Sequence, residues 1–344
     1  EYSSQYYKKY KHVIYRRQSL LNFQFLKDLI MGKIAIVTGA SRGLGRGIAL
    51  TFAKEGGYKV YATARNGNAL NALSDEASEN DKGGTVHPYI LDQNDDAAVE
   101  QFVSIVSANE GQVDVLVNSA YGGLVAIAPH FGKPFWERPI SVFDEAMNIG
   151  VRSSYVMSKF VAPLMVNQKE GLIIQTSSLG SFIYAFDVAY GVAHAGMDKL
   201  TSDMAIELRE HGVKAVTLHP QGGCETEFMK WPGAESTVFV GRAALAISDQ
   251  ASAEELNTIN GKIVFTGELA EKYGFSHDND PKGEMTAAKI EEAIFFRNLA
   301  SKVHFQNQQE INIEDYNSKT LPWKLSDSNV KGSDMEEYFK SFRI

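Results

Sequence analysis

The sequence predicts a doubly wound α/β fold with a parallel sheet, and three observations carry this prediction. Short runs rich in β-branched residues alternate with segments of helical periodicity. A glycine-rich turn joins the first run to the first helical segment. The chain has 344 residues, 44% hydrophobic and 22% charged, which suits one large domain with its own core. Apolar strands that alternate with helices imply a sheet covered on both faces.

The strand-like runs follow one another at regular intervals after residue 33. We expect strands at 34–38, 59–63, 85–91, 113–117, 172–176 and 213–218, and the sequence allows a seventh at 262–266. Between the first two runs, Ile48 and Phe52 have helical spacing. Pro88 lies inside the third run, and proline argues against a central strand there.

The two ends of the chain differ from this alternating pattern. Residues 1–30 form a basic extension, which we interpret either as a disordered segment or as a peripheral membrane contact. Residues 31–275 carry the α/β domain. Residues 276–344 are more polar with few strand signals, and we read them as a C-terminal tail of helical character.

Composition excludes several classes of protein. The single cysteine, Cys224, cannot form an intramolecular disulfide, which favours a reducing compartment and hence the cytoplasm. A net charge of −8 disfavours nucleic acid as a partner. The histidines show no metal-ligand spacing with acids or Cys224, so we predict no metal site. No apolar stretch is long enough for a transmembrane helix.

The glycine-rich turn is the first motif that carries chemistry. It runs through Gly39, Ser41, Arg42, Gly43, Leu44 and Gly45. Such a turn lets backbone N–H groups approach a pyrophosphate at the positive end of a helix, which indicates a dinucleotide. Two alternatives stay open here: a purely structural corner, and a G-x-S-x-G nucleophile elbow in which Ser41 would make the protein a serine hydrolase.

Further positions along the chain make the turn part of a recognisable set. These are Asn118 after the fourth strand, Asn148 in a helix, Ser177 and Ser178 after the fifth strand, and Tyr190 at the start of the next helix. With the glycine turn, they resemble the short-chain dehydrogenase/reductase family over about residues 33–275. The stretches 118–122, 135–139, 190–192 and 271–275 resemble its member 1-like subgroup in particular.

The resemblance implies a Rossmann-like, NAD(P)-binding domain and a role for each matched residue. Tyr190 would be the acid/base that protonates the alkoxide left by hydride transfer, and Ser178 would hydrogen-bond the substrate oxygen, with Ser177 as the alternative. Asn148 would hold a water in a proton relay. Asn118 and Thr226 would contact the cofactor.

The chain departs from the family pattern at its most important cation. Where YxxxK requires lysine, this chain has His194, one helical turn after Tyr190. Histidine can hold the cofactor ribose, but it is mostly neutral near pH 7. A second departure is Gln221, an extra residue after Pro220 that puts the place of Thr226 in doubt.

The cofactor is predicted from the loop after the second strand. An acidic residue there would accept a hydrogen bond from the ribose of NAD, whereas basic residues suit the 2′-phosphate of NADP. The chain has Ala64 and then Arg65, and Arg42 lies in the glycine turn, so we predict NADP(H). By the resemblance, Asp92 would contact adenine.

Together these features predict an NADPH-dependent oxidoreductase. It would reduce carbonyl groups, or oxidise secondary alcohols, of hydrophobic small molecules. The alternative is an NADPH-binding protein with weak or lost catalysis, because His194 replaces the lysine. Family members commonly pair through the helices that carry Asn148 and Tyr190, so a homo-oligomer is expected.

Overall fold

The computed structural model describes residues 32–221, 223–227, 234–278, 280 and 282–301. The predictions for residues 1–30, and those for 302–344 within the tail, lie outside these residues.

Within this part of the chain, strands form one parallel seven-stranded sheet in the order β3-β2-β1-β4-β5-β6-β7. The strands are β1 (Ile34–Thr38), β2 (Lys59–Ala64), β3 (Thr85–Ile90), β4 (Val115–Asn118), β5 (Gly171–Thr176), β6 (Val213–His219) and β7 (Ile263–Phe265). The chain adds strands to one side of β1 and then to the other, so the strand order reverses between β1 and β4. The prediction of a doubly wound parallel sheet is confirmed.

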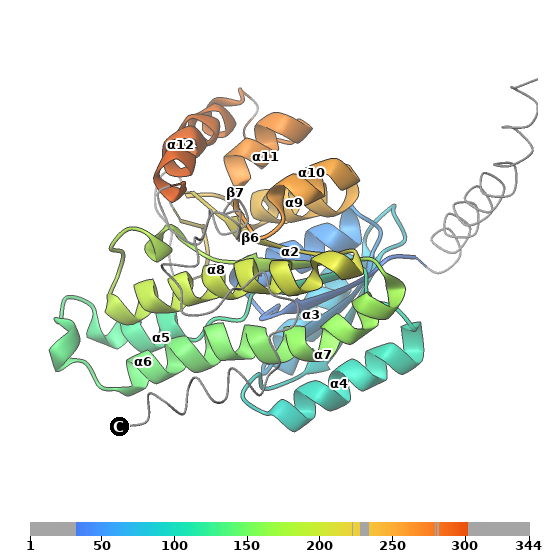
Figure 1. The fold of residues 1–344 in the computed structure, drawn as a ribbon, viewed down its shortest axis with the longest axis horizontal. Helices are drawn as coiled ribbons and strands as arrows, with labels where there is room; N and C mark the ends of the chain where they lie inside the picture. Colours follow the sequence, from blue (N-terminus) through green and yellow to red (C-terminus); the bar gives the residue numbers. More distant parts are fainter. Residues whose placement is uncertain (1–31, 222, 228–233, 279, 281, 302–344) are drawn as a thin grey trace, which may run out of the picture.

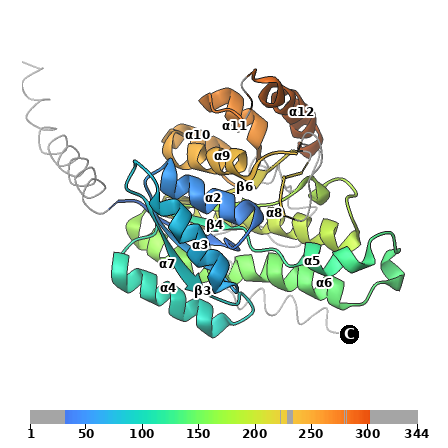
Figure 2. The same cartoon turned by 180° about the vertical axis from the view of Figure 1, so that it is seen from behind.

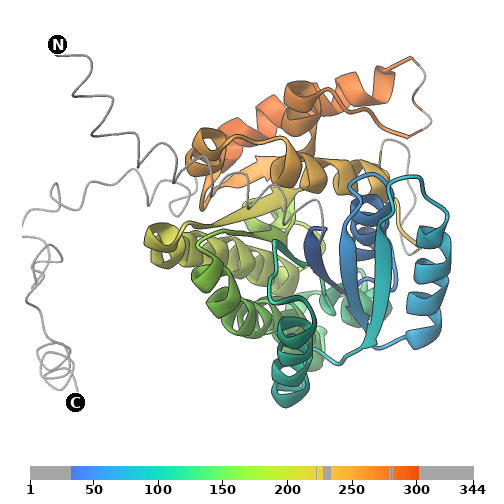
Figure 3. The same cartoon turned by 90° about the vertical axis from the view of Figure 1, so that its right-hand side faces the viewer.

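Helices cover both faces of this sheet. The faces are covered by α2 (Gly43–Lys54), α3 (Gly67–Ser78) and α9 (Thr237–Asp249) on one side, and by α4 (Asp96–Glu110), α7 (Ser153–Gln168) and α8 (Val188–Leu208) on the other. Figure 1 looks onto the second set, Figure 2 onto the first, and Figure 3 shows the strands between them. The remaining α-helices described are α5 (Gly123–Ile127), α6 (Ser141–Ala146), α10 (Ala253–Ile259), α11 (Thr266–Tyr273) and α12 (Glu284–Ala300).

The two helical layers explain why the central strands are continuously apolar. Every residue of β1 is buried, with Val37 in the core under α2 and α9 and Ile36 in the core under α4 and α7. By contrast, Val86 is the single buried residue of β3, because this strand lies at the edge of the sheet. Pro88 is therefore in an edge strand, where proline is tolerated.

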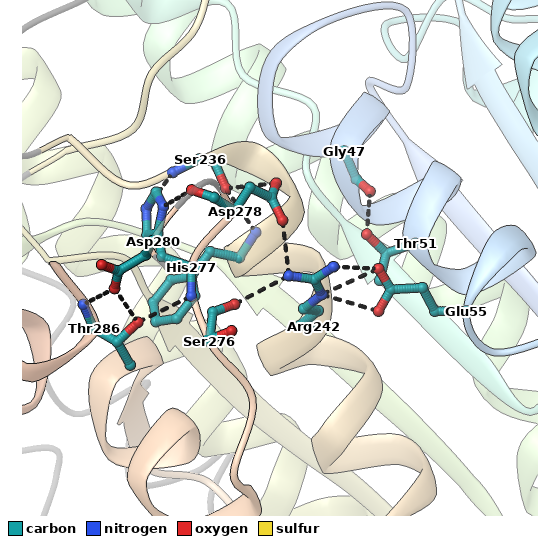
Figure 4. Close-up of polar contacts among 11 residues, drawn as sticks. Gly47, Thr51, Glu55, Ser236, Arg242, Ser276, His277, Asp278, Asp280 and Thr286 are labelled. Atoms are coloured by element: carbon teal, nitrogen blue, oxygen red, sulfur yellow. Dashed lines mark hydrogen bonds and ion pairs between the residues drawn. The ribbon is translucent and has the colours of Figure 1, made fainter. Parts of the chain in front are cut away.

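The described residues that follow Ser276, up to position 301, are packed against the domain. Arg242 of α9 pairs with Glu55 at 2.8 Å and with Asp278 at 2.7 Å, as Figure 4 shows. The ring of His277 is buried, and its Nε2 accepts a hydrogen bond from the Ser236 N–H at 2.8 Å. Helix α12 then packs on β7 and α11. Among the described helices, none has the length and apolar character that crossing a membrane requires.

Candidate active site

A cleft of about 1190 Å³ lies where the strands end. Its walls come from the glycine turn after β1, the loops after β2, β3, β4, β5 and β6, and the first turns of α8. The cleft thus lies at the carboxyl ends of the strands, where the strand order reverses between β1 and β4. Open α/β sheets bind their ligands at this position.

Most of the residues predicted from the sequence meet in this cleft. Those that line it are Gly39, Ser41, Arg42, Gly43, Leu44, Gly45, Arg65, Asp92, Ser178, Tyr190, His194 and Thr226. Residues far apart in the sequence therefore share one cavity. The glycine turn leads into α2 on one face of the sheet, and Tyr190 lies on α8, which covers the other face.

The glycines of the turn are required by close backbone approach. Gly39 has a φ of +68°, and a Cβ there would lie 2.8 Å from the Ala120 Cα. A Cβ on Gly45 would lie 2.5 Å from the Gly39 carbonyl oxygen. Both positions exclude any side chain, so the turn stays tight and the first turn of α2 faces the cleft.

An anionic group already lies against the start of α2. The Gly43 N–H faces the carboxylate of Glu227, with nitrogen–oxygen distances of 3.1 and 3.4 Å. The positive end of a helix attracts anions, and the carboxylate shows that this N–H is available to one. The residues present therefore fit a dinucleotide pyrophosphate. Glu227 was not predicted, because only the folded loop after β6 brings it to the glycine turn.

The part of the cleft formed by the glycine turn and the loop after β2 carries basic and amide groups. Arg42 and Arg65 line it and are exposed, and Asn66 and Asn68 stand beside Arg65. Asn66 also caps α3 by accepting a hydrogen bond from the Ala69 N–H at 3.1 Å. The loop after β2 contributes no acidic residue to this wall.

Tyr190 and Ser178 face each other at the centre of the cleft. The Tyr190 hydroxyl donates a hydrogen bond to the Ser178 Oγ at 2.7 Å, and Ser178 Oγ also accepts from the Gly180 N–H at 3.1 Å. Burial raises the pKa of Tyr190 to about 12, although the hydrogen bond to Ser178 acts to lower it. A proton donor and a second hydroxyl thus lie within one hydrogen bond of each other.

His194 lies directly behind the Tyr190 ring. The ring centroids are 4.0 Å apart, and Nδ1 of His194 is 2.8 Å from the Tyr190 carbonyl oxygen. A carbonyl can only accept, so Nδ1 carries the proton and Nε2 of the neutral ring is an acceptor. Burial lowers the pKa of His194 to about 4, so the ring is neutral near pH 7.

Tyr121 completes the aromatic surroundings of this pair, and it was not among the residues predicted from the sequence. Its ring contacts the rings of His194 and Tyr190 edge-on, with centroid distances of 4.8 and 5.8 Å. Its hydroxyl is buried and has no hydrogen-bond partner among the residues that the structure describes. The sequence signal that could have identified Tyr121 was its position just after the Asn118 motif.

Two predicted residues do not reach the cleft with their side chains. Asn148 is exposed, because the helix opens into a π turn over Met147–Arg152 in which Ile149 has φ −102° and ψ 59°. Ile149 lines the cleft in its place. Asn118 is buried behind the cleft and donates to the Ser158 Oγ at 2.9 Å. The structure thus places neither side chain in the cleft, and the roles of Asn148 and Asn118 stay predictions.

The part of the cleft beyond Tyr190 is apolar. Its walls are formed by Tyr121, Leu124, Val125, Ile149, Leu179, Ile183 and Phe186. A hydrophobic ligand would suit this part of the cleft, because moving its apolar surface out of water costs no hydrogen bonds.

Comparisons with known proteins agree with this geometry. The family described as short chain dehydrogenase matches residues 33–235. Dehydrogenase/reductase SDR family member 1 of Homo sapiens is 38% identical over 264 residues, which cover 71% of this chain and 82% of that protein. The match takes in the glycine turn around Ser41, so it gives no support to the serine hydrolase alternative.

Solved structures show the same fold. A metagenomic short-chain oxidoreductase in complex with NADP is 28% identical, with a TM-score of 0.54 over 64% of this chain and 92% of that one. A 7 alpha-hydroxysteroid dehydrogenase complexed with NADH and 7-oxo glycochenodeoxycholic acid is 26% identical, with a TM-score of 0.59 over 68% and 92%.

Proposed function

We propose, from the premise that this chain belongs to the short-chain dehydrogenase family, that it is an NADPH-dependent oxidoreductase. Its reaction would be the reduction of a carbonyl group on a hydrophobic small molecule, or the reverse oxidation of a secondary alcohol.

One observation carries this proposal. The Tyr190 hydroxyl and the Ser178 Oγ are 2.7 Å apart in a cleft whose other end is the glycine turn of α2. A carbonyl oxygen that lay near both hydroxyls would receive a hydrogen bond from Ser178 and a proton from Tyr190.

The chain's own groups divide the work of the reaction. Nicotinamide supplies the hydride when the cofactor is bound. Ser178 stabilises the negative charge that develops on the substrate oxygen, and Tyr190 gives that oxygen its proton. His194, with Nε2 as an acceptor, would take a hydrogen bond from a ribose hydroxyl of the cofactor. The glycine turn and the first N–H groups of α2 would hold the pyrophosphate.

The preference for NADPH is supported by Arg42 and Arg65, which line the same end of the cleft, and by the absence of an acid beside them in the loop after β2. Arg65→Asp should therefore weaken NADPH binding and strengthen NADH binding, as measured by quenching of protein fluorescence. Tighter binding of NADH than of NADPH by the unmodified protein would contradict the assignment.

A second candidate function is favoured by the neutral state of His194. With the pKa of His194 lowered to about 4, the site lacks the permanent cation that the family's lysine supplies beside the tyrosine. The protein would then bind NADPH and turn over slowly or not at all.

Turnover in a substrate panel separates the two candidates. Decanal, 2-decanone, benzaldehyde and acetophenone cover aliphatic and aromatic carbonyls, and the loss of NADPH absorbance reports reduction. We expect consumption with at least one of them. NADPH binding without consumption would favour the second candidate, and no binding of NADPH or NADH would contradict both.

Assembly is part of the proposal. Pairing through α7 and α8 would cover Tyr155, Val188 and Val192, which are 53%, 44% and 45% exposed. Val156 of α7, by contrast, is buried in the core between α7 and the sheet and is not open to a partner. A strictly monomeric mass by light scattering would contradict the pairing. The cytoplasmic location and the membrane-surface contact stay predictions.

A further inference from the structure

Arg138 is the buried member of an otherwise exposed segment. Between α5 and α6 the chain makes an excursion in which Phe135, Trp136 and Ile140 are 60%, 73% and 77% exposed. The side chain of Arg138 is only 6% exposed. This is the reverse of the usual distribution, in which apolar side chains turn inward and charges face water. A specific partner must account for the buried guanidinium.

The partner is Asp187, which immediately precedes the Tyr190 helix. Arg138 Nη1 lies 2.5 Å from Asp187 Oδ2, and the Asp187 side chain is 3% exposed. Arg138 Nε donates to the Lys133 carbonyl at 2.8 Å, so the guanidinium also fixes the turn of its own segment. The pair joins positions 138 and 187 across the molecule.

Asp187 in turn holds the backbone of Tyr190. Asp187 is the N-cap of α8, and its Oδ1 accepts a hydrogen bond from the Tyr190 N–H at 2.6 Å. The first N–H groups of a helix have no partner inside the helix, so this hydrogen bond depends on Asp187 alone. One oxygen of the Asp187 carboxylate, Oδ2, thus accepts from Arg138, and the other, Oδ1, accepts from the Tyr190 N–H.

The backbone next to Asp187 adopts a strained conformation. Phe186, just before Asp187, has a φ of +61°, a conformation that non-glycine residues rarely adopt. The Phe186 ring packs edge-on against the Tyr190 ring, with the two centroids 4.8 Å apart. If Asp187 moved, the backbone and the ring environment of Tyr190 would both change.

Stability alone does not explain a pair of this kind. Burying two charges costs about as much as their attraction returns, and a buried ion pair is often replaced by apolar residues without loss. The pair instead fixes the orientation of the Asp187 side chain, because a carboxylate that accepts hydrogen bonds from a guanidinium is held in one orientation.

We propose that Arg138 is a positioning residue for the reaction, acting through Asp187 to hold Tyr190 against Ser178. This inference rests on the proposed function of Tyr190. It makes the 128–140 excursion a part of the active site, although the Arg138 side chain does not line the cleft.

Two variants and their combination test the proposal in the full chain. Arg138→Gln leaves the Asp187 carboxylate buried without its cation, and kcat with NADPH and decanal should fall about tenfold or more while KM changes less than about twofold. Arg138→Gln combined with Asp187→Asn removes both charges and keeps an N-cap, because asparagine caps as well as aspartate. The pair should recover kcat to within about threefold of the unmodified protein. Arg209→Gln, an exposed arginine at the end of α8, is the matched control and should change neither constant.

A second readout does not need turnover. Amide hydrogen exchange of the peptide that contains Tyr190 should be faster in Arg138→Gln and slow again in the double variant, because the Tyr190 N–H is protected by Asp187. If the unmodified protein reduces no carbonyl but exchange responds in this way, the proposed function fails and the positioning stands. If Arg138→Gln does not fold, the double variant must fold and show protected exchange. Unchanged kcat and unchanged exchange in folded Arg138→Gln, or a double variant no better than the single one, would overturn the proposal.

Discussion

His194 sets the electrostatics of the site more than any other side chain. It occupies the position of the family's lysine, but it is buried, stacked on the Tyr190 ring and neutral, with its Nδ1–H donated to the Tyr190 carbonyl. Burial raises the pKa of Tyr190 to about 12, and no charge on His194 offsets this. The phenol therefore gives up its proton less easily than it would beside a cation.

His194→Lys should raise turnover. At an effective dielectric near 20, a unit charge about 5 Å away is worth roughly 3 kcal/mol, or about 2 pKa units of Tyr190. Part of this is lost in burying the ammonium, so we expect kcat to rise about tenfold to a hundredfold. Steady-state rates with NADPH and the best carbonyl of the panel check this. Unchanged or lower kcat in a variant that folds and binds NADPH would show that the proton takes another route.

Sequence spacing predicted which residues the topology brings together in the cleft. Tyr190, Ser178 and the glycine turn follow strand ends or begin helices, so the topology alone brings them together. Asn148 was misplaced because a π turn changes which side chain faces inward, and such a turn has no sequence signal here. Arg138 and Glu227 reach their partners only across the folded chain, so spacing could not find them.

Helix α12 is bound to the loop after β6 through Gln221, the extra residue in the family pattern. The Gln221 side-chain amide donates to the Lys289 carbonyl at 2.6 Å, and its Oε1 accepts from the Gly267 N–H at 2.6 Å. Lys289 Nζ returns a hydrogen bond to the Gln221 carbonyl at 3.3 Å. The inserted residue thus joins β6, α11 and α12.

Gln221→Ala should destabilise the fold. The change leaves the Gly267 N–H, near the start of α11, without the acceptor Oε1 of Gln221, at a cost of about 1–3 kcal/mol in the free energy of unfolding, and it removes the hydrogen bond to the Lys289 carbonyl. Denaturant unfolding followed by circular dichroism measures the loss. Gln101→Ala, an exposed glutamine on α4, is the control and should change little. Equal midpoints for the two variants would mean that α12 is not held through Gln221.

The strands were predictable and the packing of α12 was not, for a physical reason. Buried parallel strands are continuous apolar runs, which the sequence displays directly in β1 and β4. Helix α12 buries Lys289 and exposes Phe295, so its inward face cannot be read from hydrophobicity. Its contacts combine the hydrogen bonds to Gln221 with the packing of Ala293 and Ala300 on β7.

Two buried ionisable groups couple the stability of the whole molecule to pH. Burial raises the pKa of Glu235 from 4.5 to about 8, and lowers that of His194 from 6.5 to about 4. A raised carboxyl pKa gives stability that is full below pH 4.5 and is lost as pH rises toward 8, whereas the lowered histidine pKa gives stability that is gained between pH 4 and 6.5. The two effects oppose each other below pH 6.5, and only that of Glu235 continues above it.

The free energy of unfolding should therefore fall between pH 6.5 and 8, by at most about 1.4 kcal/mol per pH unit. Glu235→Gln should flatten this decline, because the amide can still accept from the Gln221 N–H and the Thr266 hydroxyl without ionising. Urea unfolding at several pH values, for both proteins, measures the slopes. Equal slopes would mean that Glu235 does not titrate in this range.

The central claim is that Tyr190 delivers the proton in an NADPH-dependent reduction, and one comparison tests it directly. Tyr190→Phe keeps the ring that packs against His194 and Phe186 and removes only the hydroxyl that faces Ser178. NADPH binding and NADPH consumption with the best carbonyl are measured side by side for the variant and the unmodified protein. We expect both proteins to bind NADPH with similar affinity, and we expect consumption by the variant to fall about a hundredfold or more. Equal consumption by the two proteins would contradict it.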